Sequence, residues 1–255
     1  MRRVVAVGLL VWSFSTAAAG WDETGLDETG FKETTAPPTA HQTREIEGWS
    51  VRVDERLLNG EQEGLGREAL ALISRRLADI VLQLPADKVE RLRKVTIQLD
   101  LAHGKLTSAQ YHPSAGWLKN NGYSESLAKV VHIPAARDYA NRDHQQVQPW
   151  SLLHELAHAY HDQVLDFENE EVKAAYHRFK ERGAYESVLH IKGHKTRHYG
   201  LTNQMEFFAE LTEAYFGVND FYPFNRAELL QAEPEIAALL KKIWEGPASS
   251  GGNDP

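Results

Sequence analysis

The chain has 255 residues and contains no cysteine. Disulfide bonds and thiolate metal sites are therefore excluded, and a hydrophobic core must hold the fold together. The chain is also short of positive charge, with 28 Lys and Arg against 36 Asp and Glu and a formal net charge of −8. This balance argues against nucleic acid or an anionic membrane as the main partner.

Only one apolar run stands out, residues 4–14, and it is shorter than the roughly 20 residues that a transmembrane helix needs. It follows Met1-Arg2-Arg3 and precedes Ala17-x-Ala19. This order predicts a secretory signal peptide at residues 1–19. We therefore expect a secreted protein, extracellular or periplasmic, with no membrane insertion after signal cleavage. An uncleaved anchor is the alternative.

Residues 20–44 have the composition of a linker. They contain three polar five-residue repeats, which begin at Trp21, Leu26 and Phe31, and then a stretch with two prolines. Such a segment buries too little apolar surface to offset the entropy of ordering it. We expect a disordered linker here, a single domain at 45–246 and a flexible tail at 247–255.

Within the expected domain, apolar residues follow both regular periods. Alternation predicts strands at 48–54, 95–101 and 129–133. Helical spacing predicts helices at 67–84, 86–93, 168–182, 203–217, 225–231 and 234–244, and Pro149 suits the first turn of another helix. The expected fold is α+β, mostly helical with a small mixed sheet.

The helix after Pro149 contains the motif His154-Glu155-Leu-Ala-His158. Residues four apart lie on one face of a helix, so both imidazoles can reach one zinc ion. Glu155 falls on the neighbouring flank, where it can act on a metal-bound water as general base. An apolar stripe at helical spacing predicts that this helix is partly buried. The alternative is a pair of histidines that only form hydrogen bonds.

A tetrahedral catalytic zinc needs a third protein ligand and leaves one position to water. Glu206 and Glu210 lie four residues apart on the helix expected at 203–217. We expect Glu206 to bind the metal and Glu210 to orient one of the two histidines. The alternatives are a capping box for Glu206, which lies three residues after Asn203, and a solvated helix face for Glu210 and Glu213.

The run Tyr199-Gly-x-Thr-Asn-x-x-Glu-Phe-Phe-Ala-Glu210, downstream of His-Glu-x-x-His, resembles the catalytic domain of anthrax toxin lethal factor and related gluzincin metallopeptidases. The resemblance covers residues 149–162 and 197–217 only. It implies a zincin-like fold in which a sheet edge near 129–133 can receive an extended peptide. The resemblance implies that His154, His158 and Glu206 bind the zinc and that Glu155 is the general base. It further implies that Tyr199 donates a hydrogen bond to the oxyanion and that Glu210 supports a zinc ligand.

These patterns predict a secreted zinc-dependent metallopeptidase with one catalytic Zn²⁺ and a peptide or protein substrate. The toxin's delivery and substrate-recognition regions have no counterpart, so the resemblance bears on the site and the reaction rather than on the substrate. Two alternatives keep the zinc site. One is a non-catalytic zinc-binding homologue, and the other is a zinc amidase that acts on cell-wall peptide linkages.

The other histidines lack this spacing. We expect His112, His132 and His144 to stand alone, and His161 to lie at the surface. The basic stretch 185–198 is expected to be a solvated loop rather than a second metal site. His198, at its end, is the second candidate for the oxyanion donor.

Overall fold

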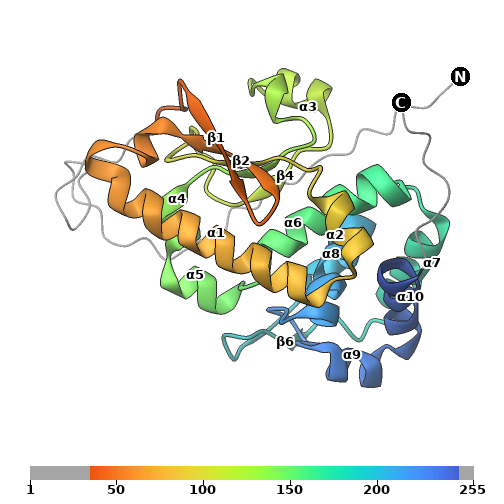
Figure 1. Cartoon of the computed structure of the whole chain (residues 1–255). Coiled ribbons are helices and arrows are strands. Elements are labelled where there is room, and N and C mark those ends of the chain that lie inside the picture. The colour runs from red at the N-terminus through yellow and green to blue at the C-terminus, as the bar shows by residue number, and fades with distance from the viewer. Residues whose placement is uncertain (1–34, 247–255) are drawn as a thin grey trace, which may run out of the picture.

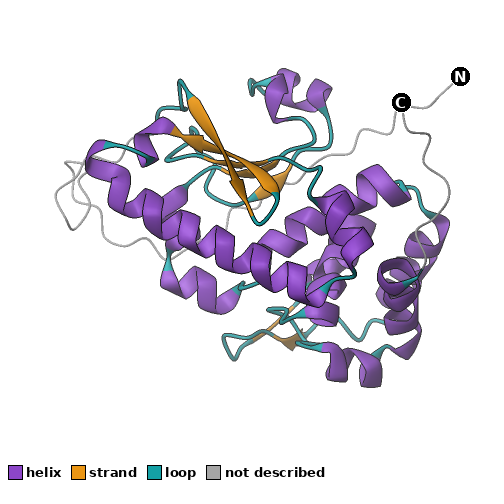
Figure 2. Ribbon diagram, viewed as in Figure 1, coloured by secondary structure: helices purple, strands orange, loops and turns teal. Residues whose placement is uncertain are grey.

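The computed structural model describes residues 35–246 and shows an α+β fold, mostly helical with a small mixed sheet (Figures 1 and 2). The expected fold class is confirmed to this extent. Among the described residues, no helix has both the length and the apolar character needed to cross a membrane. The expected signal peptide, most of the expected linker and the expected tail lie outside the described residues.

The sheet has five strands in the order β1-β2-β3-β5-β4. Their bounds are His41–Ile46 (β1), Trp49–Asp54 (β2), Ile97–Leu99 (β3), Gln110–Tyr111 (β4) and Val131–Ile133 (β5). The pairs β2–β3 and β3–β5 are parallel, and the two outer pairs are antiparallel. A two-residue turn joins β1 to β2 with positive φ at Glu47 and at Gly48, a conformation that glycine adopts at little cost.

The two faces of the sheet differ in polarity because side chains alternate along each strand. One face buries the apolar side chains of Val51, Val53, Ile97, Leu99, Val131 and Ile133 in the main core. The alternate positions Gln98 and His132, which are register partners, point to the other face. The helices α1 (Glu63–Gln83) and α6 (Ser151–Tyr160) cover the apolar face (Figure 1).

Helix α1 buries one stripe, formed by Ala69, Ile73, Leu77 and Ile80 at helical spacing. It ends before Leu84-Pro85, and Pro85 then caps α2 (Ala86–Leu92). The carbonyl of Leu92 accepts a hydrogen bond of 2.9 Å from Nε1 of the buried Trp49. This bond ties the end of α2 to the sheet.

The second half of the chain is helical. It contains α7 (Glu170–Glu181), α8 (Gln204–Phe216), α9 (Arg226–Ala232) and α10 (Pro234–Glu245), and short strands β6 (Val188–Leu189) and β7 (Lys195–Thr196). Helix α8 is buried at every residue from Phe207 to Phe216 and packs on α6. Trp244 of α10 is fully buried and stacks on Phe208. Helix α8 is therefore the centre of this half.

Gly217, just after α8, lets the two central helices approach. A Cβ atom at this position would lie 2.0 Å from the ring of Trp150, which precedes α6. Close packing against this ring is therefore a reason for glycine at this position. The side chain of Trp150 thus fixes the separation of α6 and α8.

Several expectations differ from the structure. Strand β1 begins at His41, so the expected linker at 20–44 overlaps the domain by at least four residues. Strand β4 and the helix α3 (Ala115–Asn120) lie where the sequence predicted neither a strand nor a helix. The helices α4 (Ala136–Ala140) and α5 (Arg142–Val147) were not expected. Because β4 pairs beyond it, β5 lies inside the sheet and is not its edge.

Candidate metal centre

Helix α6 places two imidazoles on one face. His154 and His158 are one turn apart, and their rings meet edge to face with centroids 4.7 Å apart. The rest of α6 is largely buried, with Leu152, Leu153, Leu156 and Ala157 in the core. The core therefore fixes the rotation of the helix and the direction of both rings.

Helix α8 supplies a carboxylate to the same place. The Asn203 side chain caps this helix by accepting from the N–H groups of Met205 and Glu206 at 2.9 and 2.8 Å. The Glu206 carboxylate does not return to the cap: its Oε2 lies 3.1 Å from His154 Nε2 and 3.3 Å from His158 Nε2. Of the two halves of the capping box that the spacing suggested, only the hydrogen bonds accepted by Asn203 are formed.

The atoms offered by His154, His158 and Glu206 lie within 4.8 Å of one another and could hold a metal ion. Two imidazole nitrogens and a carboxylate oxygen are a donor set that divalent transition metals favour. The side chains of His158 and Glu206 are each 12% exposed, so the group is mostly buried but in contact with solvent.

The other ring nitrogen of His154 also has a carboxylate partner. Nδ1 lies 2.7 Å from Oε1 of Glu213, whereas Glu210 Oε1 is 3.7 Å away. Glu213 is buried, as is Glu210, so neither lies on the solvated helix face that the spacing allowed. We expected Glu210 to hold a histidine of the centre, but the hydrogen bond to His154 Nδ1 is made by Glu213. The packing of α8 on α6 places residue 213 nearer to this nitrogen.

The centre concentrates buried negative charge. Burial, together with Asp220 and Glu213, raises the pKa of Glu210 well above its ordinary value. One of its oxygens, Oε2, has no hydrogen-bond partner within residues 35–246. The pKa of Glu206 is lowered. Burial alone would raise this pKa, but the charges of His158 and His154 and their hydrogen bonds to the carboxylate outweigh burial. Like charges at such short range are stabilised by bound protons or by a cation.

Glu155 lies between the histidines and the sheet. Its Oε2 accepts a hydrogen bond of 2.6 Å from the backbone N–H of Tyr111 in the edge strand β4. Burial raises its pKa, and the neighbouring His158 and His154 act against that shift. One carboxylate oxygen is held by the strand, so the position of the carboxyl group is set by the sheet as well as by α6.

Tyr199 reaches the centre from the 3-10 turn Tyr199–Leu201. Its ring stacks on His154 at a centroid distance of 6.4 Å and an angle of 18°. Burial, followed by the charges of Glu206 and Glu210, raises the pKa of the Tyr199 hydroxyl. The hydroxyl therefore keeps its proton and remains a hydrogen-bond donor.

His198 has a different role from its neighbour Tyr199. It is fully buried, and its Nδ1 accepts from the N–H of Gly200 at 2.9 Å. Its ring packs among Phe179, Tyr185 and Phe221. The side chain is directed into the core, which disfavours it as an oxyanion donor.

Two other expectations about histidines are wrong. His161 is fully buried against Phe167 and Phe208 rather than at the surface. Most residues of the stretch 185–198 are exposed, as expected for a solvated segment, although His190 within it is buried. His112 and His132 do not stand alone, because they meet each other and Asp100. The spacing Asp100-x-x-His103 was a signal that could have indicated this second cluster.

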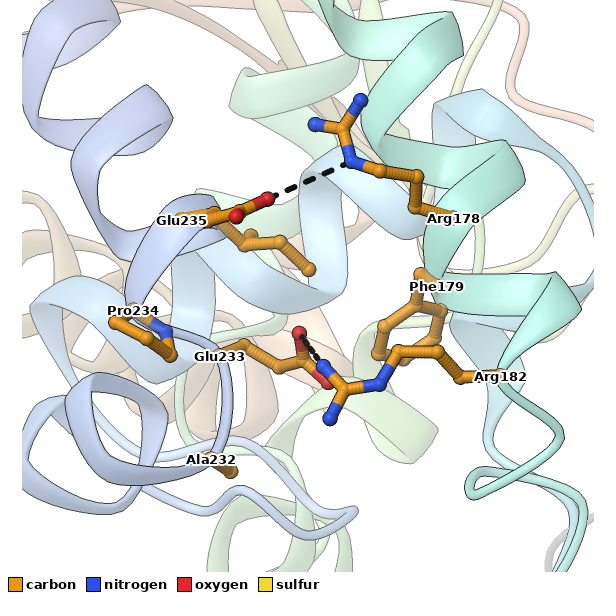
Figure 3. Close-up of a pocket in the computed structure, with 8 residues that line it drawn as sticks. Arg178, Phe179, Arg182, Ala232, Glu233, Pro234 and Glu235 are labelled. Carbon is orange, nitrogen blue, oxygen red and sulfur yellow. Dashed lines mark hydrogen bonds and ion pairs between the residues drawn. The ribbon is translucent and has the colours of Figure 1, made fainter.

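A pocket lies away from the metal centre, between α7 and the α9–α10 segment (Figure 3). It is lined by Arg178, Phe179, Arg182, Ala232, Glu233, Pro234, Glu235 and Ile236. Arg182 pairs with Glu233 at 2.7 Å, and Arg178 lies 3.6 Å from Glu235. Its arginines therefore already have acidic partners, and it shares no residue with the metal centre.

Comparisons of the chain with protein-family models, with curated proteins and with solved structures found no match.

Proposed function

We propose that the chain is a secreted zinc-dependent metallopeptidase of the gluzincin kind, as its resemblance to the catalytic domain of anthrax toxin lethal factor implies. The observation that carries the proposal is the meeting of two helices. His154 Nε2 and His158 Nε2 of α6 both lie within 3.3 Å of one oxygen of Glu206 on α8. Glu155 and Tyr199 lie beside this group.

A zinc ion held by His154, His158 and Glu206 would supply a Lewis acid that polarises the scissile carbonyl and acidifies water. Glu155 would take a proton from the attacking water and deliver it to the leaving amine. Burial raises the pKa of Glu155. The raised pKa would make its carboxylate a better acceptor for the proton of the attacking water. Its bond to the Tyr111 N–H holds it in position for that transfer.

Tyr199 would donate its protonated hydroxyl to the oxygen that gains negative charge. Stacking on His154 keeps its ring at the centre. Glu213 would hold the His154 ring in the tautomer whose Nε2 lone pair faces the metal. Strand β4 is the sheet edge beside α6, and it is the place where an extended peptide would bind.

The test compares the wild-type protein with Glu155→Gln and with Glu181→Gln, an exposed residue of α7. Each zinc-loaded protein is incubated with an unstructured protein and with quenched fluorescent peptides, with and without a chelator. We expect wild type and Glu181→Gln to cleave until chelator is added, and Glu155→Gln to keep its zinc without turnover.

Other outcomes separate the alternatives. Cleavage by Glu155→Gln at the wild-type rate would contradict the mechanism. Zinc binding without turnover of any peptide would favour a non-catalytic protein. Turnover of peptidoglycan fragments alone would favour a cell-wall amidase.

A further inference from the structure

A second cluster of histidines surrounds Asp100, just after β3. Oδ2 of Asp100 lies 2.7 Å from Nδ1 of His103 and 2.8 Å from Nε2 of His132 on β5. Oδ1 lies 2.7 Å from Nε2 of His41 on β1. Three segments, β1, residues 100–103 and β5, therefore meet at one buried carboxylate.

We propose that Asp100, His103 and His132 form a second site for a divalent transition metal ion. Their ligand atoms all lie within 4.8 Å of one another, as do those of the centre on α6 and α8. The donor set is the same, with two imidazole nitrogens and one carboxylate. In both groups the two nitrogens approach a single carboxylate oxygen, which is the point that a shared cation would also contact.

The groups around the ligands also suit a metal. A histidine ligand needs a partner for its second ring nitrogen, and Nδ1 of His132 lies 3.3 Å from Nε2 of His112. The amide of Gln98 donates to both oxygens of Asp100 at 3.1 Å. Such contacts fix the rotamer of a carboxylate before any metal arrives. His41 completes this support from the other side.

The cluster is separate from the centre on α6. Gln98 and His132 point away from the apolar face that α1 and α6 cover, and Asp100 continues the alternation from Gln98. Arg52 donates to the carbonyl of Ser126 at 3.1 Å, and its charge also interacts with Asp100. The hydrogen bonds to the two oxygens of Asp100 come from imidazole and amide groups.

Access to the cluster is from one side. Asp100 and His132 are fully buried, whereas the side chain of His103 is 13% exposed and that of His41 is 23% exposed. A metal ion can therefore enter beside His103 and complete its coordination with water. Bound there, it would connect β3, β5 and the following loop, and would strengthen the attachment of β1 through Asp100. The site would stabilise the N-terminal part of the domain.

Zinc content tests the proposal. The purified full chain is stripped with chelator, loaded with Zn²⁺, dialysed and analysed for metal. We expect two zinc ions in wild type, one in His103→Ala, one in His154→Ala and none in the double variant. His177→Gln, which alters an exposed histidine outside both groups, should keep two.

A second measurement does not depend on whether His103→Ala folds. In His154→Ala the proposed second site is intact, so Zn²⁺ at about a hundredfold excess over Kd should raise Tm by about 5–10 °C. Mg²⁺, which imidazole ligands bind poorly, should not. Absence of the zinc-dependent shift would overturn the proposal.

The results also distinguish the two sites. One zinc per chain that His154→Ala removes and His103→Ala retains would overturn the second site and leave the proposed peptidase intact. One zinc that His103→Ala removes and His154→Ala retains would support the second site and count against the peptidase centre. Wild-type protein without zinc would show that the Asp100 cluster is held by hydrogen bonds alone, and would overturn the proposal.

Discussion

The Nδ1 atom of His154 lies 2.7 Å from Oε1 of Glu213. This contact joins α6 to the buried face of α8, and it directs the other nitrogen of the ring toward Glu206. Without it, the imidazole could rotate or take the other tautomer. Glu213, two helical turns after Glu206 on α8, therefore sets the orientation and tautomer of the His154 ring.

Replacing Glu213 should weaken metal binding more than replacing Glu210. We expect Glu213→Gln to lower zinc affinity by about 10- to 100-fold. The substitution removes the negative charge beside His154 Nδ1 and keeps a side chain of the same size and shape. Glu210→Gln should have a smaller effect, since its carboxylate is 3.7 Å from the same nitrogen. Titration against a chelating dye measures both. A larger loss in Glu210→Gln would show that Glu210 is the orienting carboxylate.

Removing the Tyr199 hydroxyl should affect turnover and not metal content. Tyr199→Phe keeps the ring that stacks on His154. If the proposed peptidase activity is present, kcat should fall by about 10²–10³-fold, as for other oxyanion donors, with KM little changed. Steady-state kinetics and metal analysis provide the measurement. Tyr222→Phe is the control, and equal kcat in the two variants would exclude the assigned role.

A methyl group at Gly217 should force α6 and α8 apart. The new Cβ would meet the Trp150 ring at 2.0 Å, and we expect Gly217→Ala to lose about 1–3 kcal/mol in free energy of unfolding, as overpacked cores do. Urea unfolding of the metal-free protein measures this. Gly64→Ala, at a position of α1 with open space, should leave stability unchanged or slightly raised. Unchanged stability in Gly217→Ala would mean that Trp150 has room to move.

Acid should destabilise the domain through its buried histidines. Burial, followed by the charge of Arg197, lowers the pKa of His198 to about 3. Above the unfolded pKa of about 6.5 the residue is neutral in both states and contributes no pH dependence. As pH falls from that value to about 3, only the unfolded state binds the proton. Stability is lost at up to about 1.4 kcal/mol per pH unit for this residue.

The variant His198→Asn tests this, because its amide oxygen can still accept from the Gly200 N–H. Urea unfolding between pH 7 and pH 4.5, in chelator, should show a shallower loss of stability than in wild type. His177→Gln, which changes an exposed histidine, should keep the wild-type slope. An unaltered slope in His198→Asn would show that His198 binds its proton over the same pH range in the folded and unfolded states.

Local patterns were sufficient where the local environment decides the structure. The stripe of Ile73, Leu77 and Ile80, ended by Pro85, predicted α1 to within a few residues. The strand at 48–54 and the helix after Asn203 were predicted for the same reason, since period and capping are short-range properties. Strand β4 has only two residues, too few for any period to appear, so its place at the edge was not predictable.

The chain by itself determined the chemical inventory: no thiolates, an amphipathic helix with histidines four apart, and a capped helix with three glutamates. Only the tertiary structure decided which of those glutamates faces which nitrogen, and that Asp100 gathers His41, His103 and His132. The reason is physical. Helical and strand periods fix directions within one element, whereas the packing of α6 on α8 and the register of β3 with β5 set distances between elements.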